Sequence, residues 1–451
     1  MMSSESDSVN VCIKCKGARL LCGKSQCPIL MKNSILKSTL TIDPKEIKSN
    51  QNIFGASPPA VFVGHVGYPR VNIGPLLPIG EYAVEKNTGF LDSPESWFGK
   101  PLEEIVKYRS GMVRSNFSIG VRYQDNIDKI LGDLNRTNRK MLESTQELTM
   151  ASNSVDTEAK LSHIRVSMRY DSSSAPNGPS GRAEKIDVID NVKVLKPVDK
   201  VISDKDLKSS EAIYGYLYKS DDISTTSMQR LLSAGLLGVK KNRRLVPTRW
   251  AITAVDTIIS KSVAKSIKHY PSIDKYYTFT NDYLDNHFII LFMPGPWAFE
   301  MNEHWHSESI WNQDIFGLYP TNIAEPVIVN DYELENGRKK YADNITGAYY
   351  AARKEIVEFL SKSRRQSRAI VFREIRGGYI LPLGVWVIRE TVRQALQNGW
   401  KGSNVIQHES LKDALQVINN RFKVPLKHWL KASKLVPYSK TQKRLDFWLK
   451  N

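Results

Sequence analysis

The chain has 451 residues, of which 41% are hydrophobic and 25% are charged. This length predicts two or three domains, and the composition is that of a folded protein, which excludes disorder throughout the chain. The 64 lysines and arginines outnumber the 47 acidic residues and give a formal net charge of +17. Such an excess favours a polyanionic partner such as nucleic acid.

Membrane insertion and export are not predicted. The longest apolar run, residues 288–299, is short and contains Pro294, Gly295 and Pro296, so it is not expected to cross a bilayer. The first residues lack the basic opening and apolar middle of an export signal. We therefore expect a cytoplasmic protein with no membrane partner.

All four cysteines lie near the N-terminus, as Cys12, Cys15, Cys22 and Cys27. Their C-x2-C-x6-C-x4-C spacing predicts a four-cysteine module at residues 11–31, in which two thiolate pairs hold a structural Zn²⁺. Two disulfides are the alternative, and a reducing compartment disfavours them. We expect residues 1–10 to be disordered and residues 32–58 to form a connector.

The hydrophobic pattern predicts an α/β or α+β class fold, a mixed multi-strand globular body in two parts. The first part, residues 59–170, begins with two strand-like runs around Gly64, Gly67 and Pro69, which predict a hairpin. His65 lies in this hairpin and is assigned to packing or a turn. Residues 171–184 predict a flexible loop or linker. The other elements expected in the first part are helices at 101–110 and 126–152 and a strand at 164–170.

The second part of the body is expected at residues 185–430, followed by a basic tether at 431–441. Its predicted elements, in chain order, are β structure at 186–202, a helix from Thr225 that stops at Gly238, a helix from Thr248 to about His269, β structure at 279–299, a helix at 346–361, a buried strand at 380–388 and a helix at 389–398.

Two groups of cations are candidate nucleic-acid contacts. Between the first two helices of the second part, a basic turn would bring cations close to free helix amides, the arrangement that binds phosphate. The second group follows the helix at 346–361, with Phe372 and Tyr379 nearby for base stacking. A solvated turn and a helix end that attracts cations are the alternatives. The candidates are Lys240, Lys241, Arg243, Arg244, Arg249, Arg364, Arg365 and Arg368.

Glu300, Glu303, His304 and His306, with Glu308, form the densest set of metal-binding residue types outside the cysteines. An H-x-H pair on a strand points both imidazoles to one side, and nearby carboxylates could complete a hydrolytic metal centre. They are weak catalytic candidates, because such residues are more often packed and hydrogen bonded. Catalysis is left open, with a metal-dependent nuclease or phosphodiesterase as the enzymatic alternative.

The end of the chain carries an apolar knob in a basic, polar setting. Gln442, Leu445, Phe447, Trp448 and Leu449 include apolar side chains that share one face of a helical turn. Because a chain end normally frays in water, we expect this segment to be a flexible tail that inserts into another molecule. Docking onto its own domain is the alternative.

The terminal residues Gln442, Leu445, Trp448 and Leu449 resemble the peptide that binds the sliding clamp PCNA, with Leu449 in the place of the second aromatic. Together with the cysteine module and body segments 57–64, 245–256 and 382–390, the chain resembles the Nre family of archaeal DNA repair proteins. This resemblance implies a DNA repair factor that binds DNA and is recruited to the clamp. An RNA or ribosome-associated binding protein is the alternative.

Overall fold

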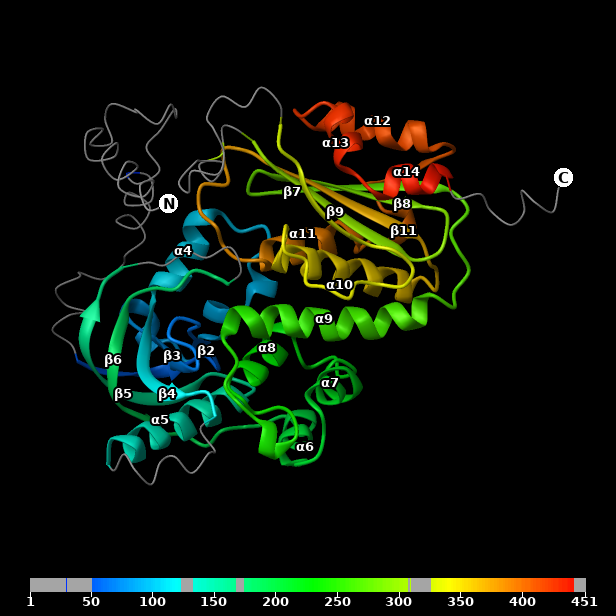
Figure 1. The fold of residues 1–451 in the computed structure, drawn as a ribbon. Coiled ribbons are helices and arrows are strands. Elements are labelled where there is room, and N and C mark those ends of the chain that lie inside the picture. The colour runs from blue at the N-terminus through cyan, green and yellow to red at the C-terminus, as the bar shows by residue number, and fades with distance from the viewer. Residues whose placement is uncertain are drawn as a thin grey trace, which may run out of the picture. The chain divides into compact units, whose positions relative to one another are not determined.

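The computed structural model describes residues 51–122, 133–167, 174–306 and 326–441, with Leu30 and Ser309 (Figure 1). The four cysteines and residues 442–451 lie outside these ranges. The described residues form two compact units. The N-terminal unit runs to Ile259 and includes Pro382–Trp386, and the C-terminal unit comprises Ser260–Leu381 and the chain from Val387. This division lies within helix α9, Thr248–Ile267, and not at residues 171–184.

A six-stranded sheet organises the N-terminal unit, in the order β1-β5-β6-β4-β3-β2. Only the β4–β6 pair is parallel. Gly55 allows β1 to approach Ala83 closely, since a Cβ at this position would lie 2.8 Å from the Ala83 carbonyl oxygen. The strands are β1 Asn52–Ser57, β2 Val61–Val63, β3 Arg70–Pro78, β4 Met112–Gly120, β5 Val155–Arg165 and β6 Ser180–Val188.

Among the helices of this unit, α8 begins at a capping serine. The Ser224 hydroxyl accepts a hydrogen bond from the Ser227 N–H and thereby caps α8. α5 packs on β6. The helices are α4 Leu102–Ser110, α5 Asp133–Met150, α6 Lys196–Ser203, α7 Ser209–Glu211 and α8 Thr225–Ser233, followed by the 3-10 turn Lys240–Asn242 and the first part of α9.

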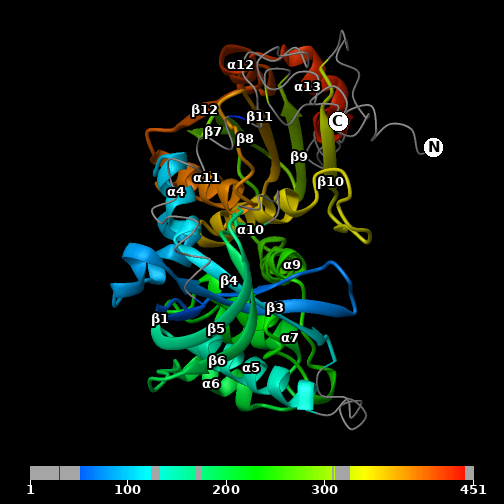
Figure 2. The same cartoon turned by 90° about the vertical axis from the view of Figure 1, so that its left-hand side faces the viewer.

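The C-terminal unit has three layers around a second six-stranded sheet, ordered β10-β9-β11-β8-β7-β12. β9 and β11 are parallel, and the other pairs are antiparallel. α12–α14 cover one face and α10 and α11 the other (Figure 2). The strands are β7 Tyr276–Tyr283, β8 Asn286–Met293, β9 Ala298–Trp305, β10 Val329–Glu333, β11 Arg368–Ile375 and β12 Val405–His408. The helices are α10 Gly347–Lys362, α11 Trp386–Leu396, α12 Leu411–Arg421, α13 Leu426–Ala432 and α14 Leu435–Thr441.

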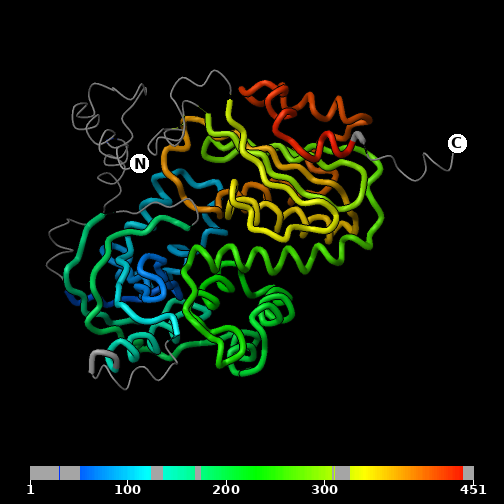
Figure 3. The backbone as a smooth tube through the Cα atoms, in the orientation of Figure 1, coloured from blue at the N-terminus to red at the C-terminus, as the bar shows by residue number. Residues whose placement is uncertain are grey.

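Trp429 anchors the C-terminal helices to the sheet. It is fully buried, and its ring centroid lies 5.8 Å from that of Phe372 on β11 and 5.1 Å from that of Phe422 at the end of α12. Leu435 and Val436 at the start of α14 are buried in the same cluster. Figure 3 follows the backbone to α14, which lies along the sheet.

The predicted mixed α/β body is confirmed, as are the hairpin of β2 and β3 and helices α4, α8, α9 and α10. The strand predicted at 380–388 is wrong. Gly384 has a φ of +98° and packs so closely on Ser174 that a Cβ would lie 2.6 Å from its carbonyl carbon, and α11 begins at Trp386. Burial of this apolar run was predicted correctly, but its conformation was not.

Four other expectations also differ from the structure. The second half of the predicted β region 186–202 is helix α6, since Pro197 suits a helix start and Val198 and Val201 share its buried face. Residues 435–441, expected in a tether, form α14. β1 begins within the segment expected to be a connector, and β6 begins within the expected loop at 171–184.

Within the described ranges, every helix is too short or too polar to traverse a bilayer.

Trp429→Ala should lower the free energy of unfolding of the C-terminal unit by about 3–5 kcal/mol, because it leaves a cavity between α13 and the sheet. Urea unfolding followed by circular dichroism measures this change. Ile406→Ala, at a side chain that is 52% exposed, is the control and should change stability by less than about 0.5 kcal/mol. Equal effects of the two substitutions would contradict the packing of α13 described above.

Candidate nucleic-acid interface

The structure separates the first group of predicted cations into two kinds. The Arg243 guanidinium donates hydrogen bonds to the carbonyl oxygens of Gly238 at 2.7 Å, Ile202 at 2.9 Å and Asp204 at 2.8 Å. It therefore holds the basic turn against the end of α6. Lys240, Lys241 and Arg244 are exposed, and Arg249 is half-buried in the first turn of α9.

Backbone hydrogen bonds join three segments that are distant in the sequence. The Val121 N–H donates to the Pro69 carbonyl oxygen at 2.9 Å, and the Val121 carbonyl accepts from the Leu245 N–H at 3.0 Å. The Val63 N–H donates to the Thr248 hydroxyl at 2.9 Å. The β2–β3 loop, the end of β4 and the start of α9 thus form one surface. We define this loop–helix surface as His65–Arg70, Arg122, Arg244, Arg249 and Trp250.

Two aromatic rings lie at the surface of this region. The Tyr68 and Trp250 ring centroids are 5.1 Å apart, with a 57° angle between the ring planes. Tyr68 is 44% exposed and Trp250 46% exposed. Val66, at the end of the hairpin loop, is 76% exposed. His65, assigned above to packing or a turn, is exposed in this loop, and its Nε2 lies 3.5 Å from Arg249 Nη1.

The loop–helix surface contains four arginines and is built from sequence stretches without an acidic residue. Its arginines are Arg70, Arg122, Arg244 and Arg249, and Arg70 is positioned by a 3.0 Å hydrogen bond from Nε to the Ser118 hydroxyl. No Asp or Glu occurs in residues 61–80, 112–122 or 239–255, the stretches that build it. Such a surface attracts phosphate, and its exposed rings can pack against bases.

The sequence analysis missed Tyr68, Arg70, Arg122 and Trp250. Arg70, Arg122 and Tyr68 are isolated in the sequence, so no local cluster identified them. The only available signal was Trp250, which directly follows a predicted contact, Arg249, at the start of a helix. The other residues join it through the hydrogen bonds of Val121.

The second predicted group behaves differently. Arg364 and Arg365 are exposed after α10. Arg368 is 4% exposed, lies 5.2 Å from the ring centroid of Tyr438 and packs on Gly295. Phe372 and Tyr379, expected to offer rings for stacking, are both buried. This group therefore lacks the exposed rings of the loop–helix surface.

The four acidic and histidine candidates do not face one another as a set. Glu303 lies on the α10 and α11 face of β9, where one carboxylate oxygen accepts from Arg373 Nη1 at 2.6 Å. Glu300 and His304 lie on the opposite face, and His304 Nδ1 donates to the Val327 carbonyl at 2.8 Å. The His304 and His306 rings are 6.1 Å apart. Across the described ranges, no group of three His, Cys, Asp or Glu side chains is placed to hold a metal ion.

Glu300 instead binds the start of α14. One carboxylate oxygen accepts from Asn330 Nδ2 at 2.8 Å and the Lys434 N–H at 2.7 Å, and the other accepts from the Ser433 hydroxyl at 2.6 Å and the Leu435 N–H at 3.1 Å. Burial raises the pKa of Glu300, against the effect of these donors, while burial lowers the pKa of His304. The carboxylate thus satisfies backbone donors at a helix start.

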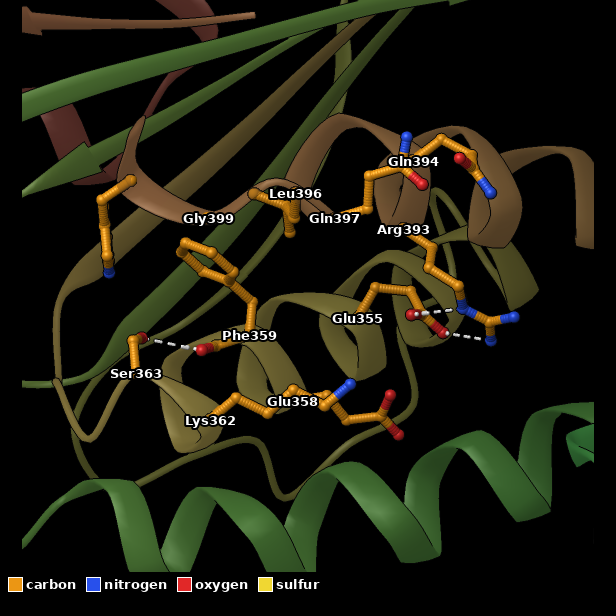
Figure 4. Close-up of a pocket in the computed structure, with 11 residues that line it drawn as sticks. Glu355, Glu358, Phe359, Lys362, Ser363, Arg393, Gln394, Leu396, Gln397 and Gly399 are labelled. Carbon is orange, nitrogen blue, oxygen red and sulfur yellow. Dashed lines mark hydrogen bonds and ion pairs between the residues drawn. The ribbon is translucent and has the colours of Figure 1, made fainter. Parts of the chain in front are cut away.

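An open pocket of about 470 Å³ lies between α10 and α11 in the C-terminal unit. Figure 4 shows Arg393 hydrogen bonded to both carboxylate oxygens of Glu355, each at 3.0 Å. Lys354 pairs with Glu355 at 2.9 Å and with Glu358 at 2.8 Å. Burial opposes ionisation of Glu355, but Lys354 and Arg393 outweigh it and lower the pKa to about 2. Glu355 in this pocket is therefore neutralised by two cations of the same unit.

Glu300→Gln should destabilise the C-terminal unit by about 1–3 kcal/mol, since an NH2 group replaces one of the two acceptor oxygens and leaves the donors on that side without an acceptor. Urea unfolding near neutral pH measures the loss. Glu409→Gln, at an exposed carboxylate that pairs with Lys275, is the matched control and should have little effect. Wild-type stability in Glu300→Gln would refute the capping role.

Comparison with known proteins places the chain in a family. The description "Archaeal Nre, N-terminal" matches residues 21–312, and "Archaeal Nre, C-terminal" matches residues 333–448. No solved structure matches the chain.

Three relatives cover most of the chain. The protein named DNA repair protein NreA of Archaeoglobus fulgidus is 37% identical over 93% of this chain and 95% of its own length. The DNA repair protein NreB of the same organism is 33% identical over 97% of this chain and 99% of its own. The DNA repair protein NreA of Haloferax volcanii is 30% identical over 85% of this chain and 86% of its own length. The chain therefore belongs to the archaeal Nre family.

Proposed function

We propose that this protein is a DNA repair factor that binds DNA through the loop–helix surface. The names of its relatives support the repair role. The main support for the binding role is a group of four arginines, Arg70, Arg122, Arg244 and Arg249. They come from three hydrogen-bonded segments that contain no acidic residue. Lys240 and Lys241 lie in the basic turn before Arg244 and add to the local positive charge.

Phosphate binding at this surface follows from its charge. Each arginine that neutralises a phosphate releases condensed counterions, so affinity should fall as salt rises. Arg249 adds its charge at the first turn of a 20-residue helix, where the helix dipole is also positive. These contacts read the backbone and not the base sequence, which suits a protein that meets damage in any sequence.

We further propose that Cys12, Cys15, Cys22 and Cys27 hold a structural Zn²⁺. Four thiolates with a C-x2-C pair suit the tetrahedral preference of this ion. The cytoplasm, where we expect the protein to act, keeps thiols reduced and available. The bound ion would stabilise the small module, because so short a segment cannot bury a sufficient core.

The last residues provide the proposed route to the sliding clamp. Gln442, Leu445, Phe447, Trp448 and Leu449 follow α14 directly in the chain. Leu435 and Val436 bury the start of α14, so the peptide follows an anchored helix and not a long tether. A short connection of this kind keeps the DNA-binding body at high effective concentration near clamp-encircled DNA.

Replacing Arg122 and Arg244 together by alanine should weaken binding to every DNA sequence and reduce the slope of log affinity against log salt by about two, since each arginine accounts for about one phosphate contact. Fluorescence anisotropy with labelled DNA over a salt series measures both quantities. Lys193 and Lys196, exposed in the same unit, are replaced together as the charge-matched control. An unchanged salt slope for the arginine pair would contradict the proposal. Tighter binding to RNA than to DNA would favour the RNA alternative.

Leu445→Ala combined with Trp448→Ala should abolish clamp binding and leave DNA affinity unchanged. A wild-type dissociation constant near 1 μM, about 8 kcal/mol, suits so small an anchor. Titration calorimetry with an archaeal sliding clamp measures it, with Lys450→Ala as the control. Clamp affinity that survives the double substitution would disprove the assignment of this peptide, whereas loss of DNA binding would link the tail to the body.

A further inference from the structure

We infer that the loop–helix surface binds unpaired bases, so that its ligand is single-stranded DNA or a frayed strand end and not continuous duplex. Tyr68 and Trp250 form the stacking platform. The inference rests on the proposed function, because the surrounding arginines bring the strand to the rings. It adds a substrate class that charge alone does not specify.

Trp250 differs from the other tryptophans that the structure describes. Trp97, Trp297 and Trp429 expose at most 1% of their surface. Among the described tryptophans, only Trp250 exposes more than a third of its surface. Its neighbour Tyr68 is exposed to a similar extent. Leaving two large rings half in water forgoes the free energy of burying them. A ligand with a flat apolar face would recover this free energy.

Hydrogen bonds fix the backbone that carries the two rings before any ligand binds. Tyr68 lies in a loop closed by hydrogen bonds from the Tyr68 N–H to the His65 carbonyl and from the Arg70 N–H to the Gly67 carbonyl, and Gly67 takes the required φ of +85°. Trp250 is carried by α9, and its backbone N–H donates to the Pro247 carbonyl at 2.8 Å. Little conformational freedom remains to be lost on binding, so stacking can contribute to affinity.

The chemistry around the rings distinguishes unpaired from paired bases. Arg249 and His65 lie beside the platform. Arg122 directly follows Val121, and Arg244 directly precedes Leu245, whose N–H donates to the Val121 carbonyl. A strand can therefore place phosphates on cations while a base stacks on a ring. In a duplex each base face is already covered by its neighbours, so the rings would meet only base edges and phosphates. A partner protein with an apolar anchor would lack the negative charge that this surface favours.

Fluorescence anisotropy measures the affinity of the full-length protein for oligo-thymidine of about 20 nucleotides and for a blunt duplex of the same length. Both ligands are longer than the ~4–16 nucleotides that such sites typically cover. Trp250→Ala and Tyr68→Ala should each weaken oligo-thymidine binding by about tenfold and change duplex binding by less than about twofold. Trp250→Phe should retain most of the affinity, and Tyr216→Ala, at another exposed ring of this unit, should retain all of it. The salt slope should be unchanged in each of these variants.

A second measurement needs no substitution. Wild-type protein is irradiated with a single strand that carries 5-iododeoxyuridine, and mass spectrometry should find the cross-links on Tyr68 or Trp250. The inference would be overturned if cross-links formed only at other residues. It would also be overturned if Trp250→Ala lost as much affinity for the duplex as for the single strand. If the aromatic variants bind normally while the Arg122 and Arg244 pair weakens both ligands, the inference fails and the proposed function stands. Absence of salt-dependent binding to either ligand would refute both.

Discussion

The two backbone hydrogen bonds of Val121 are the constraint on which the proposed interface depends. Val121 is 4% exposed, and its N–H and carbonyl each hold a different segment, the β2–β3 loop at Pro69 and the approach to α9 at Leu245. Buried backbone groups must be paired, so these bonds cannot be exchanged for water without cost. Through them, a hairpin loop and a helix start more than 170 residues apart in the chain share one surface.

Many of the chain's charged residues act inside the fold and not at its surface. Arg243 satisfies three carbonyl oxygens, Arg373 pairs with Glu303, and Glu300 accepts four hydrogen bonds at the start of α14. Each would cost free energy if buried alone, and its partners offset that cost. The count of 64 lysines and arginines therefore overstates the number of cations available to a ligand. The arginines proposed to bind DNA come from sequence stretches that contain no acidic residue.

In the C-terminal unit, the helix that precedes the proposed clamp peptide is packed on the core. Trp429, Leu435 and Val436 bury the last helices in the cluster that packs on the sheet, and Glu300 fixes the start of α14 from the strand beneath it. Body and peptide are thus joined by packed structure up to Thr441. A repair factor built this way would be held at the clamp by its tail while a different surface, on the N-terminal unit, contacts DNA.

Local patterns in the sequence determined the features that depend on near neighbours. The Ser224 cap, the period of α9 and α10, the β2–β3 hairpin and the mixed α/β class all follow from residues a few positions apart, and the expected zinc and clamp peptides rest on spacing of the same kind. Tertiary structure alone decided which cations and which rings are exposed. Arg243 and Arg244 are adjacent in the sequence, yet one is bound by three carbonyls and the other faces solvent. The reason is that burial and long-range hydrogen bonds depend on segments that meet only in the folded chain.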